Sequence, residues 1–423
     1  MRDSPAVRSP AAMAALVLFL CFACNMLGRG VGDTFIVFLL PLSEAFGWKR
    51  AQVSSVYSIY LVVTGLAAPL TGYMLDRWGP RVVYPLGFVF LGSGCLVAGH
   101  LTQLWQFQAC IGILNGLGVS MLGMVPASML ISHWFRDRMS TAMGMAYAGF
   151  GTGTLLIVPL AQYLIQSQGW RHAYRSLGVG ILALLPLLFL LPWRTMSGGP
   201  PRHARHGTPA HEETRAWPLR SAMSTRAYWQ LAQVFAFTAL AMYAMLSQIV
   251  AYLVQVGLAP LEAATAFGMA GLLSVLGMTA SGWSSDRFGF RNTATASFIS
   301  TFLGIAVLLL ISFHPARWLV VPFVLLFGIS QGARGPIIAS LCARIFRGPG
   351  FATIYGTIFA CMSLGAAVGT WMSGLLFDLT GGYRASFAFS MVCVMVAVAP
   401  FWTPRPLGAS TTPGGPLAPP ADL

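Results

Sequence analysis

The sequence predicts an all-α polytopic membrane protein in which twelve transmembrane helices form two pseudo-symmetric bundles of six. The composition, the length of the apolar stretches and motifs that recur half a chain apart predict this fold class. Of the 423 residues, 56% are hydrophobic and only 9% are charged, whereas an ordinary soluble domain is about 25% charged. So few charges cannot cover a soluble surface of this size. The composition therefore excludes a soluble globular enzyme, a collagen, a coiled coil and a disordered chain.

The apolar stretches are long and continuous, as expected for helices that cross a bilayer, each of which needs about 20 apolar residues. They do not alternate with a period of two, which argues against a β-barrel. The first stretch continues past Phe35 without a cleavage site of small residues, so it predicts an uncleaved span rather than a signal peptide. We expect spans at 11–38, 50–72, 81–101, 104–130, 139–166, 172–193, 227–253, 262–283, 292–313, 317–342, 351–377 and 384–403.

A polar segment rich in Pro, His and Arg separates the first six spans from the last six. We therefore expect an N-terminal bundle over 1–193, a cytoplasmic linker over 194–226, a C-terminal bundle over 227–403 and a disordered cytoplasmic tail over 404–423. The linker contains His203, His206 and His211, for which metal binding stays open. We expect no cofactor and no metal site elsewhere.

The basic residues predict the orientation. If both termini lie inside, seventeen of the 25 basic residues fall on inner segments, six on outer segments and two within spans. Because basic residues accumulate on the cytoplasmic side, this bias predicts cytoplasmic termini in the inner membrane of a bacterium. The topology also accounts for most of the net charge of +14, so we expect a lipid bilayer and no nucleic acid as partner.

An internal repeat relates the two halves. The segment Gly72–Arg81 (GYMLDRWGPR), between spans two and three, recurs 210 positions later as Gly282–Arg291 (GWSSDRFGFR). Pro126 and Pro336 match at the same offset. Two halves of six spans related in this way are typical of a transporter built from parallel repeats.

The repeated pattern G-x-x-x-D-R-x-G-x-R resembles the loop motif of the major facilitator superfamily, and the resemblance covers residues 11–403. A finer resemblance, to the bacterial monocarboxylate-porter-like branch related to oxalate/formate exchangers, rests on four segments. These are Phe46–Ser54 (FGWKRAQVS), Gly332–Pro336 (GARGP), Tyr355-Gly356 and Asp378-x-x-Gly381. The resemblance implies a transporter rather than an enzyme, with spans 1, 4, 7 and 10 lining a central cavity.

The charged residues of the repeated motif stand at inner helix ends. We expect them to form clusters that hold one closed conformation and break when the helices rock. The alternative is that the arginines only anchor the topology. The predicted latch residues are Asp76, Arg77, Arg81, Asp286, Arg287 and Arg291.

Three charges lie within spans, where an ionisable side chain is costly and indicates function. Asp33 is the one acid inside a span, and Arg29 lies four residues earlier on the same helix face. Arg334 is in span ten, before Gly335 and Pro336, which we expect to open the helix backbone locally. Since the resemblance puts spans one and ten at the cavity, we expect Arg334 to bind an anion bidentately, with Arg29 second and Asp33 carrying the proton. The alternative is a structural ion pair, with Arg334 capping backbone carbonyls.

The family comparison also shows departures. In monocarboxylate transporters a lysine of span one takes part in substrate and proton binding, and Asp33 stands at about that place. Their Asp–Arg pair in span eight is missing here, and the exchangers' lysine of span eleven is replaced near Met362. Arg334 is then the remaining cation for an anion. Tyr243, Gln248 and Asn115 are further candidates for substrate hydrogen bonds, although polar residues in spans also join helices.

We therefore expect a monomeric secondary transporter that moves a small organic anion, most plainly a monocarboxylate, by alternating access coupled to protons. Two alternatives stay open. An exporter of lipophilic compounds by proton antiport would not need Arg334, and a non-transporting membrane sensor of the same fold would bind its ligand without flux. The spans contain no paired acids, His cluster or metal-ligand set at catalytic spacing, so an enzyme is not expected.

Overall fold

The structure is a computed structural model that describes residues 10–48, 50–135, 137–198, 217–246, 248–258, 260–314, 316–403 and 407. In these segments all regular elements are helices. Eleven helices are long and apolar enough to cross a membrane. The pair Ser55–Leu66 and Ala68–Trp78, bent by 43°, makes twelve when it is counted as one span. The predicted fold class is confirmed.

The first half contains α1 (Pro10–Asp33), α2 (Phe35–Phe46), α3 (Arg50–Leu66), α4 (Ala68–Trp78), α5 (Pro80–Ala98), α6 (Leu104–Phe107), the π-helix η1 (Gln108–Leu114), α7 (Asn115–Leu122), α8 (Met124–Trp134), α9 (Met139–Gln168), α10 (Trp170–Ala183) and α11 (Leu185–Phe189). Two short helices, α12 (Trp193–Gly198) and α13 (Leu219–Met223), form within the region of the expected linker. Residues 199–216, which include its three histidines, lie outside the described residues.

The second half contains α14 (Arg226–Leu246), α15 (Ile249–Gln255), α16 (Pro260–Phe288), α17 (Phe290–Ile311), η2 (Arg317–Leu319), α18 (Val320–Gln331), α19 (Arg334–Ile345), α20 (Phe351–Thr380), α21 (Arg384–Val398) and η3 (Ala399–Phe401). Of the expected tail 404–423, only Leu407 is described, and it is buried.

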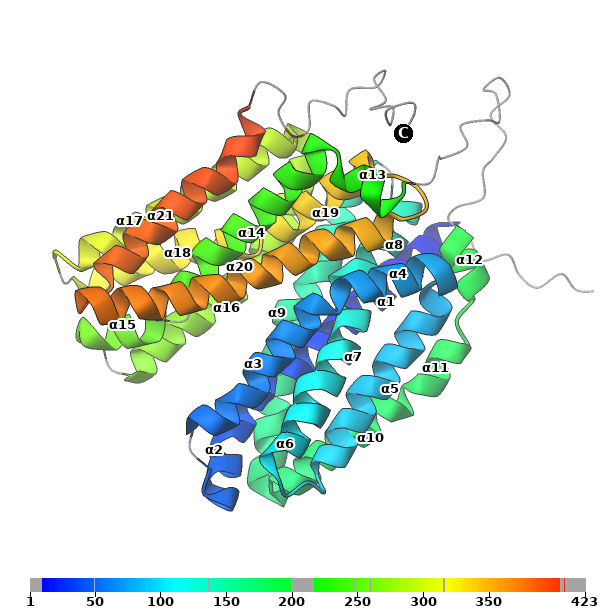
Figure 1. The fold of residues 1–423 in the computed structure, drawn as a ribbon, viewed down its shortest axis with the longest axis horizontal. Coiled ribbons are helices and arrows are strands. Elements are labelled where there is room, and N and C mark those ends of the chain that lie inside the picture. Colours follow the sequence, from blue (N-terminus) through cyan, green and yellow to red (C-terminus); the bar gives the residue numbers. More distant parts are fainter. Residues whose placement is uncertain are drawn as a thin grey trace, which may run out of the picture.

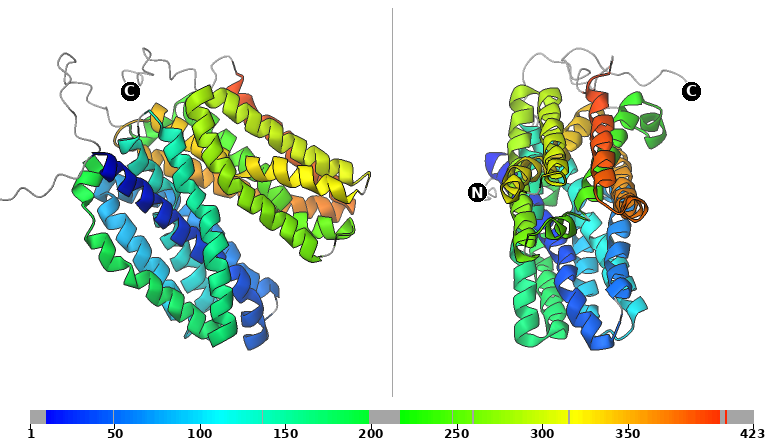
Figure 2. Two further views of the ribbon diagram at one scale, coloured as in Figure 1. Left: turned by 180° about the vertical axis from the view of Figure 1, so that it is seen from behind. Right: turned by 90° about the vertical axis from the view of Figure 1, so that its left-hand side faces the viewer.

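The helices gather into two groups, one from each half of the chain (Figure 1). The groups meet at the end of the molecule where α4, α13 and α19 lie, and the ends that carry α2 and α15 lie apart in both the front and the rear view (Figures 1 and 2). The term terminal face is used below for the end of the molecule at which the two bundles meet. This face holds the start of α1 and the ends of α4 and α16.

The helices of the repeated motif extend further than expected. The sequence predicted spans that end at 72 and 283, but α4 continues to Trp78 and α16 to Phe288. Gly79 and Gly289 end them, because each adopts a positive φ (76° and 86°) that other residues rarely adopt. The motif acids therefore lie in the last turns of α4 and α16. The helices continue through the charged Asp–Arg pairs, although the predicted spans ended before them.

Spans one, two, four, six, seven and ten are each built from more than one helix. The breaks fall at Thr34 between α1 and α2, at Ala67 between α3 and α4, at Gly123 between α7 and α8, at Leu184 between α10 and α11, at Gln248 before α15, and at Gly332 and Ala333 before α19. Pro126 and Pro336 explain the matching breaks in spans four and ten, because proline cannot donate a hydrogen bond to the residue four positions earlier. The sequence predicted a local opening of the helix backbone in span ten, but not the equivalent break at Gly123 in span four.

Glycines bring the two bundles into backbone contact at the terminal face. A Cβ on Gly72 would collide with the carbonyl of Ala352 in α20, and a Cβ on Gly356 would collide with that of Ala68. The other half repeats the arrangement, with Gly282 against Ser140 in α9 and Gly144 against Met278 in α16. Small residues at such positions let helix backbones approach closely, so the first turns of α9 and α20 pack directly on the opposite bundle.

Candidate functional site

Asp33, the last residue of α1, is held by three helices. Its Oδ2 accepts from Arg29 Nε at 2.9 Å and from the Thr154 hydroxyl of α9 at 2.9 Å. Its Oδ1 accepts from the Tyr57 hydroxyl of α3 at 3.0 Å. The Asp33 side chain is 7% exposed and that of Arg29 is 32% exposed. The acid is thus enclosed by donors, while part of its cationic partner stays accessible.

Tyrosines surround this pair. The Tyr57 ring stacks on Tyr60 at a centroid distance of 5.4 Å. The Tyr60 hydroxyl is buried next to Gly32, where no Cβ would fit, and it has no hydrogen-bond partner among the described residues. Tyr243 of α14, in the other bundle, interacts electrostatically with Arg29. Arg29 and Asp33 therefore lie on the side of the N-terminal bundle that faces the C-terminal one.

Arg334, the first residue of α19, is buried inside the C-terminal bundle with 2% of its surface exposed. Its Nη1 donates to the Thr301 hydroxyl at 2.9 Å, and its Nη2 contacts the Ser330 carbonyl at 3.1 Å and Met242 Sδ at 3.4 Å. The guanidinium lies 4.9 Å from the Phe298 ring centroid. Its Nε has no partner, and no carboxylate pairs with it in the described segments.

The expectation that Arg334 presents its fork to a cavity is not met by this conformation, because both terminal nitrogens contact its own bundle. One of these contacts is with the backbone carbonyl of Ser330, which agrees in part with the alternative that Arg334 caps backbone carbonyls. Arg29 lies in the N-terminal bundle and Arg334 in the C-terminal bundle. The two candidate cations are therefore not on neighbouring helices of one bundle. The anion-binding role of Arg334 stays a prediction.

The three polar candidates lie in different surroundings. Tyr243 is half-buried in α14, and Gln248 directly precedes α15, where its carbonyl accepts from the Tyr252 backbone at 2.9 Å. Asn115 is buried and donates to Cys95 Sγ of α5 at 3.4 Å, so it points into the N-terminal bundle. Its Oδ1 is left without a partner among the described residues.

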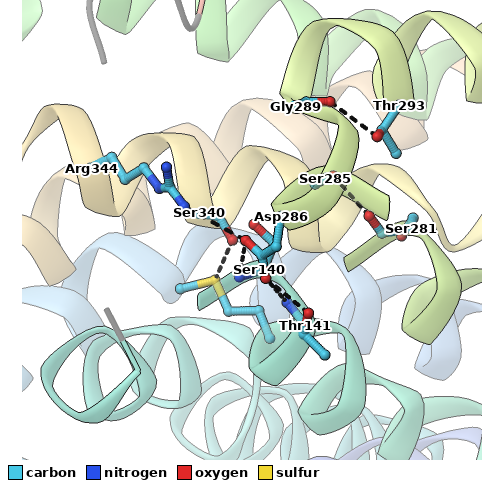
Figure 3. Close-up of polar contacts among 10 residues, drawn as sticks. Ser140, Thr141, Ser281, Ser285, Asp286, Gly289, Thr293, Ser340 and Arg344 are labelled. Atoms are coloured by element: carbon cyan, nitrogen blue, oxygen red, sulfur yellow. Dashed lines mark hydrogen bonds and ion pairs between the residues drawn. The ribbon is translucent and has the colours of Figure 1, made fainter. Parts of the chain in front are cut away.

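The motif acids bridge the two bundles. Asp286 accepts from the backbone N–H and the hydroxyl of Thr141, both at 2.8 Å, and from the Ser140 N–H at 3.4 Å (Figure 3). Arg344 of α19 lies 3.6 Å away. Asp76 repeats this at the start of α20, where the N–H of Thr353 donates at 2.8 Å and its hydroxyl at 2.6 Å. Carboxylates at helix N-termini are favoured by the free N–H groups and the helix dipole.

The motif arginines do not form the expected clusters with these acids. In the described part of the chain, neither Asp76 nor Asp286 pairs with an arginine of its own motif. Arg77 donates to the Tyr73 hydroxyl at 2.7 Å. Arg81 is exposed, whereas Arg287 stacks on Trp283 and Arg291 stacks on Trp402. The carboxylates of Asp76 and Asp286 instead accept hydrogen bonds from the free N–H groups at the N-termini of α20 and α9.

Several contact residues were not predicted. Tyr57 and Thr154 hold Asp33, and Thr301 and Phe298 contact Arg334. The three-residue spacing of Tyr57 and Tyr60 puts both on one face of a helix, which is the one signal in the sequence that indicated them. Within the described residues, no group of three or more His, Cys, Asp or Glu could hold a metal ion.

Comparisons with known proteins agree with this architecture. The sequence model of the family described as Major Facilitator Superfamily matches residues 18–354 and 282–420. The MFS-type transporter YcxA of Bacillus subtilis (strain 168) is 26% identical over 95% of this chain and 97% of its own. Monocarboxylate transporter 13 of Rattus norvegicus is 28% identical over 88% and 84%, and monocarboxylate transporter 12 of Homo sapiens is 25% identical over 88% and 77%.

Solved structures share the fold at low sequence identity. The proton:xylose symporter XylE superposes with a TM-score of 0.75 at 13% identity, over 94% of this chain and 96% of its own. The human organic anion transporter MFSD10 superposes with a TM-score of 0.69 at 17% identity, over 93% and 99%. The twelve spans, the repeated motif and the match of the family model together show that this chain is a transporter, not an enzyme, and that it belongs to the Major Facilitator Superfamily.

Proposed function

We propose that this transporter moves small organic anions, monocarboxylates in particular, by alternating access in symport with protons. One observation carries the proposal. Arg334 is a buried cation, and no carboxylate pairs with it in the described segments. An uncompensated buried charge costs several kcal/mol, on the order of 3–5 when a pair has lost its partner. A charge kept at that cost within a membrane span is best explained by an anionic ligand that neutralises it.

The break in span ten supports an anion at the same place. Arg334 is the first residue of α19, so the N-terminus of this half-helix, with the positive end of its dipole, lies at the same break in span ten. Broken transporter helices commonly direct such half-helix N-termini at anionic substrate groups. The present partners of Arg334 are a hydroxyl, a carbonyl and a thioether. All three are neutral, so a carboxylate would displace them favourably.

The Arg29–Asp33 pair supports proton coupling. A proton on Asp33 would remove the charge that holds Arg29, while Tyr57 and Thr154 could still hydrogen-bond to the neutral acid. Arg29 would then be free to attract the carboxylate of a substrate. One proton and one anion would thus enter together as an electrically neutral pair, and loss of the proton would restore the ion pair and release the anion.

The substrate class and the orientation are parts of the same proposal. Two of the relatives named above are monocarboxylate transporters, which supports carboxylates as substrates. The arginine bias supports cytoplasmic termini in a bacterial inner membrane, so the terminal face would be cytoplasmic and the bundles would be closed on that side. Asp76 and Asp286 would then latch the outward-facing state of a monomer whose bundles span 1–193 and 227–403.

Uptake of a labelled monocarboxylate panel into proteoliposomes tests this function. An inward proton gradient should drive uptake of at least one acid above its equilibrium level, and a protonophore should abolish the accumulation. Liposomes without protein provide the baseline. If folded protein takes up no acid, either with the proton gradient or with the protonophore added, the proposal is wrong. Export of lipophilic compounds or transport of a non-carboxylate solute then replaces it.

A further inference from the structure

The helices α17 and α21 lie on the part of the C-terminal bundle that is remote from the other bundle (Figure 1). Their side chains border a shallow, open apolar groove. The groove has a volume of about 500 Å³. Every residue that lines it is hydrophobic: Phe302, Met391, Val392, Met395, Val396 and Ala399. A groove without polar groups offers nothing to a water-soluble solute, but it suits a hydrocarbon chain.

A cationic and aromatic cluster lies at the end of this groove on the terminal face. The Arg291 guanidinium stacks 3.8 Å from the ring centroid of Trp402, which is 58% exposed. Trp402 Nε1 donates to the Thr295 hydroxyl at 3.1 Å. Tryptophan and arginine at such a position are typical of the level of lipid headgroups.

The cluster and the groove are continuous on both helices. Arg291, Thr295 and Phe302 recur at spacings of four and seven residues, so they share one face of α17. On the other side, the backbone N–H of Trp402 donates to the carbonyl of Ala399, a groove residue, at 2.9 Å. An exposed cation therefore stands directly at the end of an apolar channel that faces the membrane.

We propose that this groove binds an anionic phospholipid, with one acyl chain along α17 and α21 and the phosphate on Arg291. A guanidinium matches a phosphate bidentately. Neither ion pair of the described residues involves Arg291, so its charge is available, and it favours a headgroup with net negative charge over a zwitterionic one. The site is separate from Arg334 and Asp33, and it does not depend on which solute is transported.

The N-terminal bundle offers a matched comparison. Arg81 occupies the position equivalent to Arg291 and is also exposed. Gly92, the equivalent of Phe302, has no side chain to line a groove, and a Cβ there would collide with Leu182. Trp193, near the position equivalent to Trp402, is buried and stacks on Tyr84 at 5.8 Å. Arg81 thus has the charge without an exposed tryptophan equivalent to Trp402.

Native mass spectrometry of the delipidated full-length protein tests the proposal. The protein is titrated with phosphatidylglycerol and, separately, with phosphatidylcholine of the same acyl chains. Phosphatidylglycerol should bind more tightly, and Arg291→Gln should weaken its binding about tenfold, as expected for loss of a charge-assisted contact. Arg81→Gln should leave the affinity within about twofold. Val392→Trp, which fills the groove from the lipid side, should also weaken binding while keeping the cation.

Unfolding temperatures without added lipid show whether each variant is folded. Equal binding by the wild-type protein and Arg291→Gln would overturn the proposal. So would an equal loss in Arg81→Gln, since binding would then follow the overall charge and not this site. If Arg291→Gln does not fold, Val392→Trp decides: undiminished binding of phosphatidylglycerol by this variant contradicts an acyl chain in the groove.

Discussion

Asp286 accepts two hydrogen bonds of 2.8 Å from Thr141, a residue that lies 145 positions earlier in the other bundle. Asp76 and Thr353 form the equivalent contact, so the two halves of the chain are joined at the terminal face by the same device used twice. In each case a carboxylate at the end of one helix meets the N-terminus of a helix in the opposite bundle. An electrostatic contact of this kind can form and break without any change inside either bundle.

Replacing Asp286 by Asn should open the terminal face. The amide keeps the size of the side chain but loses the charge that interacts with the α9 N-terminus, which is worth about 1 kcal/mol. That loss corresponds to a shift of about fivefold in the ratio of closed to open molecules. Electron paramagnetic resonance distances between spin labels at positions 81 and 291 measure this ratio. Asp137→Asn, at an exposed acid of the same face, is the control and should not change it.

A side chain at Gly282 should prevent the closed contact more strongly. A Cβ there meets the carbonyl of Ser140, which belongs to the backbone and cannot move aside as a side chain could. We expect Gly282→Val to depopulate the conformation described here and to slow transport, with the same label pair reporting a longer mean distance. Gly180→Val is the matched control, since a Cβ on Gly180 meets no atom within 4 Å. Unchanged distances in Gly282→Val would show that this packing does not set the closed state.

Asp33→Asn should separate proton coupling from anion movement. Asparagine resembles the protonated acid, so Arg29 is permanently released and no proton can be carried. We expect gradient-driven accumulation to be lost, whereas exchange of labelled for unlabelled anion across the membrane continues. Both assays use the same proteoliposomes. Accumulation that survives in Asp33→Asn would assign the proton to another group.

Tyr57→Phe provides a graded test of the same site. The substitution removes one of the three donors to Asp33 and keeps the ring that stacks on Tyr60. Loss of one hydrogen bond to a charged group is worth about 1.5–3 kcal/mol. We expect the carboxylate to be held less firmly beside Arg29, so the initial rate of gradient-driven uptake should fall by about tenfold or more, the fold-change to which this free energy corresponds. Uptake by Tyr57→Phe at the wild-type rate would contradict a role of Asp33 in proton coupling.

The elements that follow from local pattern were predictable. Spans appear as apolar stretches, and the Arg29–Asp33 pair follows from a four-residue spacing on a single helix. The helix ends were missed because the glycines at 79 and 289, and not the charges before them, stop α4 and α16. A local opening of the helix at Gly335 and Pro336 was expected, but a full interruption before Arg334 was not, because a proline in a long span can bend a helix or interrupt it, and tertiary packing decides between the two.

The contacts of the site depend on partners that are remote in the sequence. Thr154 lies 121 residues from Asp33, and Thr301 lies 33 residues from Arg334. No periodicity relates such pairs, so their contacts arise only when the bundles pack. The direction in which the Arg334 side chain points from α19 also depends on this packing. For this reason the sequence indicated the charge but not its burial within the C-terminal bundle.

The initial rate of monocarboxylate uptake by Arg334→Gln shows whether this arginine binds the transported anion. The comparison is with the wild-type protein and with Arg317→Gln, in which an exposed arginine that donates to the Gly257 carbonyl is changed in the same way. With equal amounts of folded protein, we expect Arg317→Gln to keep the wild-type rate and the rate of Arg334→Gln to fall at least tenfold, the loss expected when a buried charge–carboxylate contact is removed. Uptake by Arg334→Gln at the wild-type rate would contradict this role and make Arg334 a structural residue.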